Sequence, residues 1–132
     1  MSTTSYTPPV SKGALWTGYV ISALPALALL FSAFGKFFPA EGTEQLLEPI
    51  GWKIGQLFWL GILEAAVAVV YLIPRTSVLG AILIAGYMGG AIATHLRIGD
   101  MMIVPQILIG VFVWLGLWLR DPRLRSLIPF RT

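Results

Sequence analysis

The chain contains no cysteine and a single histidine, His95. The absence of cysteine excludes disulfide bonds, thiolate nucleophiles and cysteine-held iron–sulfur clusters within the chain. One histidine cannot supply both axial ligands of a bis-histidine haem, so such a site would need a second subunit. No paired carboxylates stand at the spacing of a metal site. We therefore expect no intrinsic cofactor and no metal site.

Charged residues are scarce, at 11% of the chain, whereas soluble domains carry about a quarter. Hydrophobic residues make up 57%, and the mean hydropathy is +0.82. They gather in four blocks, each close to the ~20 residues that a helix needs to cross a bilayer. These blocks are apolar on every side, which excludes a soluble helical protein whose helices keep a polar face. No basic stripe lies on a soluble domain, so nucleic acid is not an expected partner.

The predicted fold is therefore all-α, an integral membrane four-helix transmembrane bundle. We expect the spans at about 14–38, 54–73, 77–97 and 102–119, between a flexible tail at 1–13 and a basic C-terminal tail at 121–132. The first block is longer than a signal-peptide core, which favours a retained span. The stretch between the first two spans, "PAEGTEQLLEPIGWK", is expected to be a short surface helix or loop, broken at Pro49 and Gly51.

The distribution of basic residues predicts the orientation in the membrane. Four spans place both termini on the same side. Six Lys or Arg residues fall on that side and three on the other: Lys12, Arg75, Arg120, Arg123, Arg125 and Arg131 against Lys36, Lys53 and Arg97. Basic residues accumulate on the cytoplasmic side of membrane proteins, so we expect an inner-membrane protein with both termini in the cytoplasm.

Small residues recur every four positions in the third span, at Gly86, Gly90 and Thr94. Rows of this kind let two helix backbones approach closely in lipid. We therefore predict that this row forms a close helix–helix contact. Tyr87 and His95 belong to a neighbouring row on the same helix.

Several polar residues converge from different segments on one half of the bundle, and each also has a purely structural interpretation. Glu64 near the middle of the second span is the most costly to place in lipid, at roughly 2.5 kcal/mol or more. The alternatives are a structural carboxyl group for Glu64, a satisfied interface histidine for His95, a snorkelling side chain for Arg97 and a helix–helix hydrogen bond for Gln106. The hypothesis is that Glu64 and His95 share one polar pocket, with Lys36 near its mouth.

The segments "LLFSAFGKFF", "IPRTSVLGAILIAGYMGGAIATHLRIGD" and "RDPRLR" resemble the DoxX-like family of small four-helix membrane proteins. The resemblance covers about 31–129. It implies that Lys36, Glu64, His95 and Arg97 stand at the polar positions of the family. The family is named after a subunit of a thiosulfate:quinone oxidoreductase, and other relatives are linked to membrane redox complexes. The resemblance thus implies a membrane redox connection.

Together these observations favour a redox-linked or small-molecule-binding membrane subunit, with a quinone-like or lipid-like ligand. The expected ligand-binding residues are Lys36, Glu64, Tyr87, His95, Arg97 and Gln106, with Tyr71 and Trp114 as further apolar walls. Glu64, His95 and Lys36 are the candidates for proton transfer or charge balance, although the sequence identifies no reaction. The alternatives are a non-catalytic assembly subunit and, after oligomerisation, a small proton or solute pathway. Expected partners are membrane lipid, a second copy or a membrane redox partner.

Overall fold

The computed structural model describes residues 9–131 and is built from helices. Its elements are α1 (Lys12–Phe37), α2 (Thr43–Leu47), η1 (Glu48–Ile50), α3 (Ile54–Leu72), η2 (Pro74–Thr76), α4 (Ser77–Arg97), α5 (Val104–Arg120) and α6 (Pro122–Arg125). The flexible tail predicted at 1–13 lies mostly outside the described residues. The Ser11 hydroxyl accepts a hydrogen bond from the Ala14 backbone N–H and starts α1 at Lys12.

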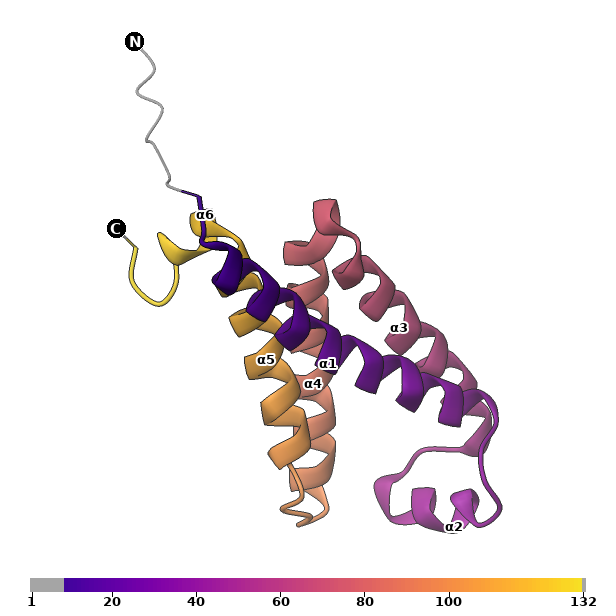
Figure 1. Cartoon of the computed structure of the whole chain (residues 1–132). Coiled ribbons are helices and arrows are strands. Elements are labelled where there is room, and N and C mark those ends of the chain that lie inside the picture. The colour runs from indigo at the N-terminus through magenta and orange to yellow at the C-terminus, as the bar shows by residue number, and fades with distance from the viewer. Residues whose placement is uncertain (1–8, 132) are drawn as a thin grey trace.

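Three helical segments are long and apolar enough to cross a membrane: Lys12–Phe37, Ile54–Leu72 and Pro74–Arg97. The fourth apolar helix, α5, has 17 residues, at the lower edge of the usual range for a spanning helix. The first turn of α1 and α6 lie at one end of the bundle, and α2 and the α4–α5 turn lie at the other (Figure 1). This arrangement is that of a helical membrane bundle whose chain runs back and forth between two ends.

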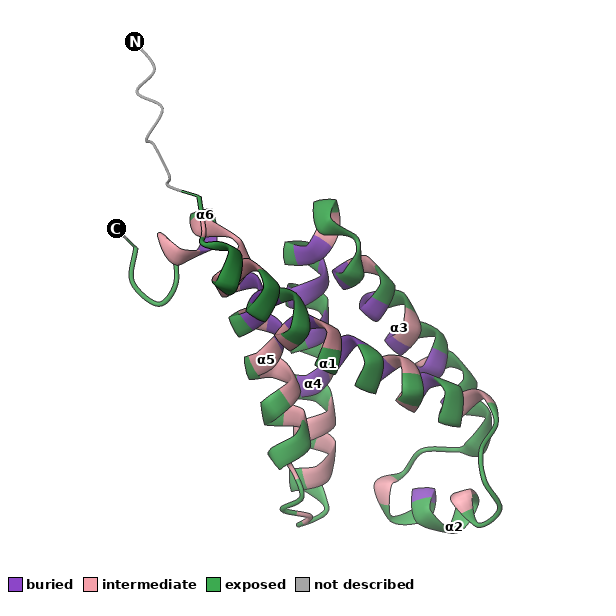
Figure 2. Cartoon of the chain, viewed as in Figure 1, coloured by how far each residue is buried: buried purple, intermediate pink, exposed green. Residues whose placement is uncertain are grey.

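The outward faces of the helices are apolar, and the core is narrow. Exposed residues cover the outside of the bundle in Figure 2, and they include Trp16 and Phe31. Inside, Tyr71 is fully buried and donates a hydrogen bond of 2.7 Å from its hydroxyl to the Val113 carbonyl, which ties α3 to α5. Apolar side chains turned outward are expected where the surrounding medium is hydrocarbon rather than water.

Helices approach closely at glycines near the end that holds the termini. A Cβ on Gly18 of α1 would lie 2.8 Å from the Gly116 carbonyl oxygen of α5, and one on Gly80 of α4 would overlap the backbone of Tyr71. The absence of a side chain at these positions lets the backbones meet. At this end of the bundle the close contacts are therefore at Gly18, Gly80 and Gly116, and the predicted row in α4 is considered with the site below.

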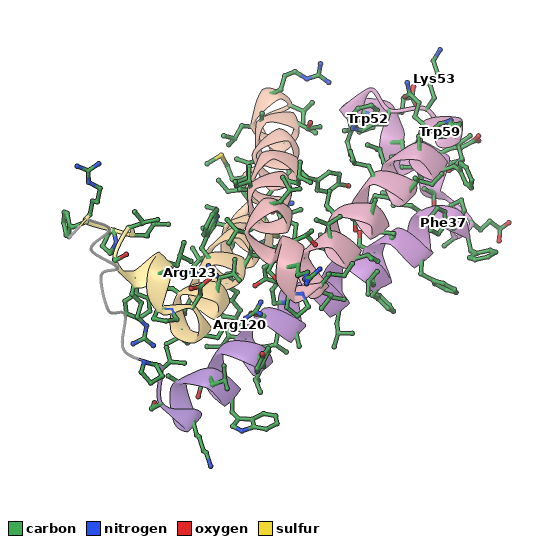
Figure 3. All side chains as sticks on the ribbon, turned by 90° about the horizontal axis from the view of Figure 1, so that it is seen from above. Phe37, Trp52, Lys53, Trp59, Arg120 and Arg123 are labelled. Atoms are coloured by element: carbon green, nitrogen blue, oxygen red, sulfur yellow. The ribbon has the colours of Figure 1, made fainter. Side chains whose placement is uncertain are left out.

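The C-terminal segment folds back onto the bundle. Leu124 of α6 is buried, and the Arg125 guanidinium donates hydrogen bonds to the carbonyls of Trp118 and Leu119 at the end of α5. Cations and donors at a helix C-terminus satisfy its free carbonyl groups. Figure 3 shows Arg120 and Arg123 in this region, away from Trp52. The basic segment thus closes one end of the bundle, and the opposite end holds the site.

The connection between α1 and α3 forms a cap over that opposite end. Gly42 immediately precedes α2 with φ +89°, and Gly51 follows η1 with φ +87°. These left-handed conformations suit glycine and fold the segment into a compact turn. Leu47 is buried beneath it, as expected of a short surface helix with one apolar face. The cap, defined as residues 39–53, therefore belongs to the folded bundle.

Candidate functional site

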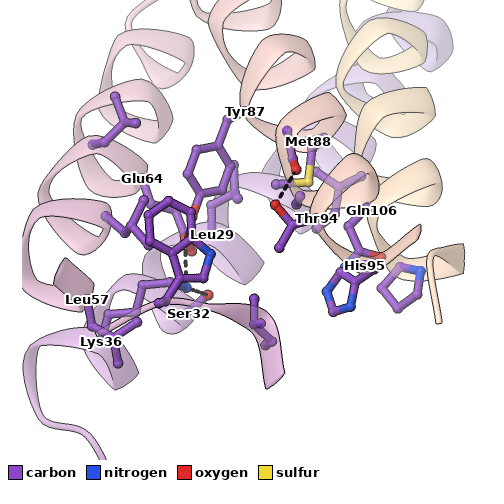
Figure 4. A pocket seen from close by; sticks show the side chains of 18 of the residues that line it. Leu29, Ser32, Lys36, Leu57, Glu64, Tyr87, Met88, Thr94, His95 and Gln106 are labelled. Carbon is purple, nitrogen blue, oxygen red and sulfur yellow. Dashed lines mark hydrogen bonds and ion pairs between the residues drawn. The ribbon is translucent and has the colours of Figure 1, made fainter. Parts of the chain in front are cut away.

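A cavity of about 530 Å³ lies between the helices beneath the cap (Figure 4). Residues from α1, α3, α4 and α5 contribute to its wall, together with Leu47, Ile50 and Trp52 of the cap. Its wall is mostly apolar and carries two polar groups of residues. Small-molecule sites in proteins have volumes of roughly 300–1,000 Å³ and this same mixture of linings. The cavity is therefore of the size and composition of a ligand site.

The first polar group is centred on Glu64 of α3. The Lys36 ammonium of α1 lies 2.8 Å from Glu64 Oε2, and the Tyr87 hydroxyl of α4 donates a 2.5 Å hydrogen bond to the same oxygen. Lys36 also donates to the Ser32 hydroxyl at 2.7 Å, one turn earlier in α1. The spacing of Ser32 and Lys36 places both on the inward face of α1. The carboxylate thus joins three helices through charged and neutral hydrogen bonds.

The two members of this ion pair differ in exposure. The Glu64 side chain is 2% exposed, whereas that of Lys36 is 22% exposed. A buried charge is tolerated only with a partner, because desolvation costs several kcal/mol per ion. Lys36 supplies the countercharge and Tyr87 supplies a hydrogen bond. The predicted place of Lys36 near the pocket mouth is therefore refined, since its ammonium is in direct contact with Glu64.

One oxygen of Glu64 has no partner. Oε2 receives both bonds described above, and Oε1 is buried without a hydrogen-bond partner among the described residues. Most buried polar atoms in folded proteins are hydrogen-bonded, so an exception calls for a specific cause. Glu64 is among the residues that line the cavity, but Oε1 itself is buried behind the wall.

The second polar group is centred on His95, near the end of α4. Its Nδ1 lies 2.9 Å from Asp100 Oδ2, and Asp100 Oδ1 accepts a hydrogen bond from the Met102 backbone N–H. The Met102 N–H and the His95 ring hold the pKa of Asp100 below its usual value. Asp100 is therefore an anion that fixes the orientation of the imidazole at the α4–α5 turn.

Gln106 completes this group from α5. Its amide nitrogen is assigned toward the carbonyls of Met102 and Ile103, at 3.3 and 3.1 Å, because carbonyls only accept hydrogen bonds. Its oxygen then accepts a hydrogen bond of 3.3 Å from His95 Nε2. His95 thus lies between two acceptors, the Asp100 carboxylate and the Gln106 amide oxygen.

Five predicted binding residues line the one cavity, and a sixth does not. The five are Lys36, Glu64, Tyr87, His95 and Gln106. No direct hydrogen bond joins Glu64 to His95 among the described residues, so the two groups lie on separate parts of the wall. Arg97 instead donates a 2.7 Å hydrogen bond to the Ile50 carbonyl and anchors the cap to α4. Arg97 is not among the residues that line this cavity, so its ligand contact stays a prediction.

Two expectations about the wall are wrong. Tyr71 is in the core, where its hydroxyl bonds the Val113 carbonyl. Trp114 packs against that core and does not line the cavity. Part of the apolar wall comes from the cap residues Leu47, Ile50 and Trp52, which were not among the predicted lining residues. The leucine pair and Trp52 in an otherwise polar connection were the available signal.

The predicted close contact of the row in α4 is wrong within this chain. A Cβ added to Gly86 or Gly90 would meet nothing within 4 Å. Both glycines line the cavity together with Thr94, whose hydroxyl bonds the Gly90 carbonyl of its own helix. The missing side chains leave open space rather than a helix contact. The row therefore widens the cavity.

Comparison with known proteins adds the family to this geometry. The model of the DoxX-like family matches residues 20–119. The chain belongs to the DoxX-like family. Members of this family are small membrane proteins, in agreement with the helical bundle. No curated protein and no solved structure matches the chain. Among the described residues of this DoxX-like protein, no group of three metal-ligating side chains is present.

Proposed function

We propose that this DoxX-like protein binds a small amphiphile, quinone-like or lipid-like, in the cavity beneath the cap. The observation that carries the proposal is the combination of a mostly apolar 530 Å³ cavity with the Lys36–Glu64–Tyr87 cluster, in which two donors from two other helices meet the buried Glu64 carboxylate. An apolar wall suits a hydrocarbon or ring system, and the polar clusters orient its head group. The ligand enters from the surrounding lipid, which is the partner that we assign to the apolar outer faces.

The roles of the polar residues follow from their contacts. Glu64 is the hydrogen-bonding centre of the cavity, and Lys36 balances its charge. His95 lines the cavity with Nδ1 on Asp100 and Nε2 on the Gln106 oxygen, and a polar group of the ligand would take the place of Gln106 on Nε2. A quinone as substrate requires a membrane redox partner to exchange electrons with it, and we include such a partner in the proposal. No intrinsic cofactor is part of it.

The matched variants Gly90→Trp and Gly89→Trp test this function. Gly90 lines the cavity, whereas its neighbour Gly89 is exposed on the outside of α4. Mass spectrometry of the small molecules that co-purify after mild extraction is expected to find a quinone or lipid enriched in the parent protein. Gly89→Trp should retain it and Gly90→Trp should lose it. Equal content in all three proteins would contradict the proposal, and stable association with a larger enzyme in that case would favour the assembly-subunit alternative.

The membrane placement is proposed in the same way. We infer that α5 is a fourth span and that the protein lies in the inner membrane with both termini in the cytoplasm. The six basic residues at the terminal end support this orientation, including Arg120 and Arg125 at the foot of α5. A C-terminal phosphatase fusion is expected to be inactive and a fluorescent-protein fusion to be active. The opposite pattern would reverse the orientation and move the cavity to the cytoplasmic half.

A further inference from the structure

The side chain of Arg120, the last residue of α5, is held in a fixed place against α1 (Figure 3). Its Nε donates a 3.2 Å hydrogen bond to the Ser22 hydroxyl, and its guanidinium carbon lies 5.1 Å from the centre of the Tyr19 ring. Ser22 is buried, and its Oγ lies so close to Gly116 of α5 that an added Cβ there would overlap it. The close approach of α1 and α5 therefore fixes the position of this guanidinium.

The two terminal nitrogens of the same guanidinium are open. Ser22 takes the N–H on Nε, and the guanidinium carries further N–H donors on Nη1 and Nη2. Neither of these nitrogens has a hydrogen-bond partner among residues 9–131. Arg120 is partly exposed, and the buried side-chain polar atom without a partner in the same range is Glu64 Oε1, not an atom of Arg120. The terminal N–H groups are thus both unpaired and accessible from outside the bundle.

Arg120 also lacks a countercharge among the described residues. No carboxylate oxygen there lies within ion-pair distance of it. Asp121 is close in the sequence but pairs with Arg123. The glutamates of the cap and Asp100 lie at the opposite end of the bundle (Figure 1). The neighbouring guanidinium of Arg125 is already engaged with backbone carbonyls. Arg120 therefore combines a fixed position with a missing anion.

The surroundings of Arg120 are those of the head-group level of a membrane. Tyr19 and Trp16 form an edge-to-face pair on α1 with ring centres 6.4 Å apart, and both side chains are exposed. Exposed Trp and Tyr residues gather where hydrocarbon meets water. Val20 and Leu24, which follow on α1, are exposed and apolar. An anion with an attached hydrocarbon chain thus finds a cation and an apolar surface side by side.

The phosphate of a lipid matches the open edge of the guanidinium. Paired N–H···O bonds from a guanidinium to a phosphate are short and strong, because both partners are charged. The planar arginine side chain suits this geometry better than lysine does. A zwitterionic lipid would bring a cationic group as well, and the nearby carboxylate of Asp121 is already paired with Arg123. A lipid with a net negative charge has no such unmatched cation.

We propose that Arg120, Ser22 and Tyr19 form a binding site for the phosphate of an anionic phospholipid, whose acyl chains lie along the outer face of α1. Arg120 binds the phosphate, Tyr19 supports the guanidinium, and Ser22 holds Nε so that the terminal N–H groups stay free. None of the three residues lines the cavity beneath the cap. The site is therefore separate from that cavity and does not depend on the proposed function.

Native mass spectrometry of the purified full chain, released from mixed micelles, measures its affinity for single lipids. Dioleoyl phosphatidylglycerol and dioleoyl phosphatidylcholine share their acyl chains and differ in net charge. The parent protein is expected to bind phosphatidylglycerol about tenfold more tightly, which corresponds to ~1.4 kcal/mol. Equal affinity for the two lipids would overturn the proposal.

Variants of equal charge locate the site. Arg120→Gln should abolish the preference for phosphatidylglycerol, and Arg120→Lys, which keeps the charge without the paired N–H groups, should retain only part of it. The matched control Arg75→Gln removes the same charge from an exposed arginine of the α3–α4 turn and should keep most of the preference. A preference that persists in Arg120→Gln would overturn the proposal, because the general positive charge of this end would then select the lipid.

Two further measurements keep the test sharp. If Arg120→Gln does not fold, Ser22→Ala replaces it: this variant keeps the guanidinium but removes the acceptor on Nε, and an unchanged preference in both Ser22→Ala and Arg120→Lys would overturn the site. Glycerol phosphate carries the anion without acyl chains and should not displace phosphatidylglycerol at equal concentration. Displacement would assign the site to a free phosphate and overturn the assignment to a lipid. Gly90→Trp should keep the preference, whereas its loss there would place the lipid in the cavity instead.

Discussion

Replacement of Lys36 by methionine is the most informative perturbation of the buried cluster. Methionine keeps the length and apolar stem of the lysine and removes the charge that lies 2.8 Å from Glu64 Oε2. Removal of one member of a buried ion pair typically costs 3–5 kcal/mol, because the other charge stays buried without compensation. The Tyr87 hydrogen bond to Glu64 remains, and Lys36 is partly exposed. We therefore expect a loss near the lower limit, about 3 kcal/mol in the free energy of unfolding.

Because Glu64 is more deeply buried than Lys36, we expect a different loss of stability when the carboxylate, rather than the ammonium, is removed. Glu64→Gln leaves the partly exposed Lys36, which can reach the surface, so its cost should be smaller, about 1 kcal/mol. The double variant Lys36→Met/Glu64→Gln contains no uncompensated charge and should be more stable than Lys36→Met alone. Double-mutant cycles isolate this pairwise energy from the separate effects of the two substitutions.

Reversible unfolding in mixed micelles of a mild detergent and sodium dodecyl sulfate measures these free energies. Lys12→Met at the exposed start of the same helix is the matched control and should change stability by less than about 0.5 kcal/mol. The reasoning is refuted if Lys36→Met is as stable as the control. It is equally refuted if the double variant is no more stable than Lys36→Met.

Two further predictions concern the helix contacts and the α4–α5 turn. Gly80→Ala should lower the free energy of unfolding by about 2 kcal/mol, because its Cβ would overlap the Tyr71 backbone, whereas Gly86→Ala should be tolerated; equal thermal stability of the two variants would contradict the assigned contacts. The lowered pKa of Asp100 means that its stabilising effect is present above the ordinary value of 3.8 and is lost as the pH falls through the lowered value. The protection factor of the Met102 amide, which is corrected for the intrinsic pH dependence of exchange, should fall over that acidic range in the parent protein and should be low throughout in Asp100→Ala; a protection factor that does not change with pH in the parent would argue against this bond.

The presence of membrane-spanning helices was predictable because hydropathy acts along the chain. Four apolar blocks of bilayer length predict membrane helices, and the spacing of Ser32 and Lys36 places them on one face. Lys36, Glu64 and His95 were selected because an ionisable residue in an apolar segment needs a polar environment. Each of these inferences uses only the sequence of a single helix and needs no knowledge of its neighbours.

The predictions failed where the environment of a residue depends on the neighbouring helix. Periodicity places Gly86 and Gly90 on one face of α4 but does not reveal whether that face meets another backbone or open space. The same absence of a side chain serves close packing at Gly80 and cavity volume at Gly90. The contact of Arg97 was not predictable for a related reason, since its partner is the Ile50 carbonyl, 47 positions away in the cap. Backbone acceptors carry no sequence signature.

The site of labelling by a photoactivatable ligand tests the central claim most directly. A 4-nonylphenol analogue with a diazirine in its alkyl chain is irradiated with the protein in nanodiscs, and the modified residues are mapped by mass spectrometry. We expect labels on the cavity-facing residues of α3 and α4, such as Leu57 and Met88, with labelling reduced in Gly90→Trp and retained in Gly89→Trp. Labels confined to outward residues such as Trp16 and Phe31, unchanged in Gly90→Trp, would show that the cavity is not a ligand site.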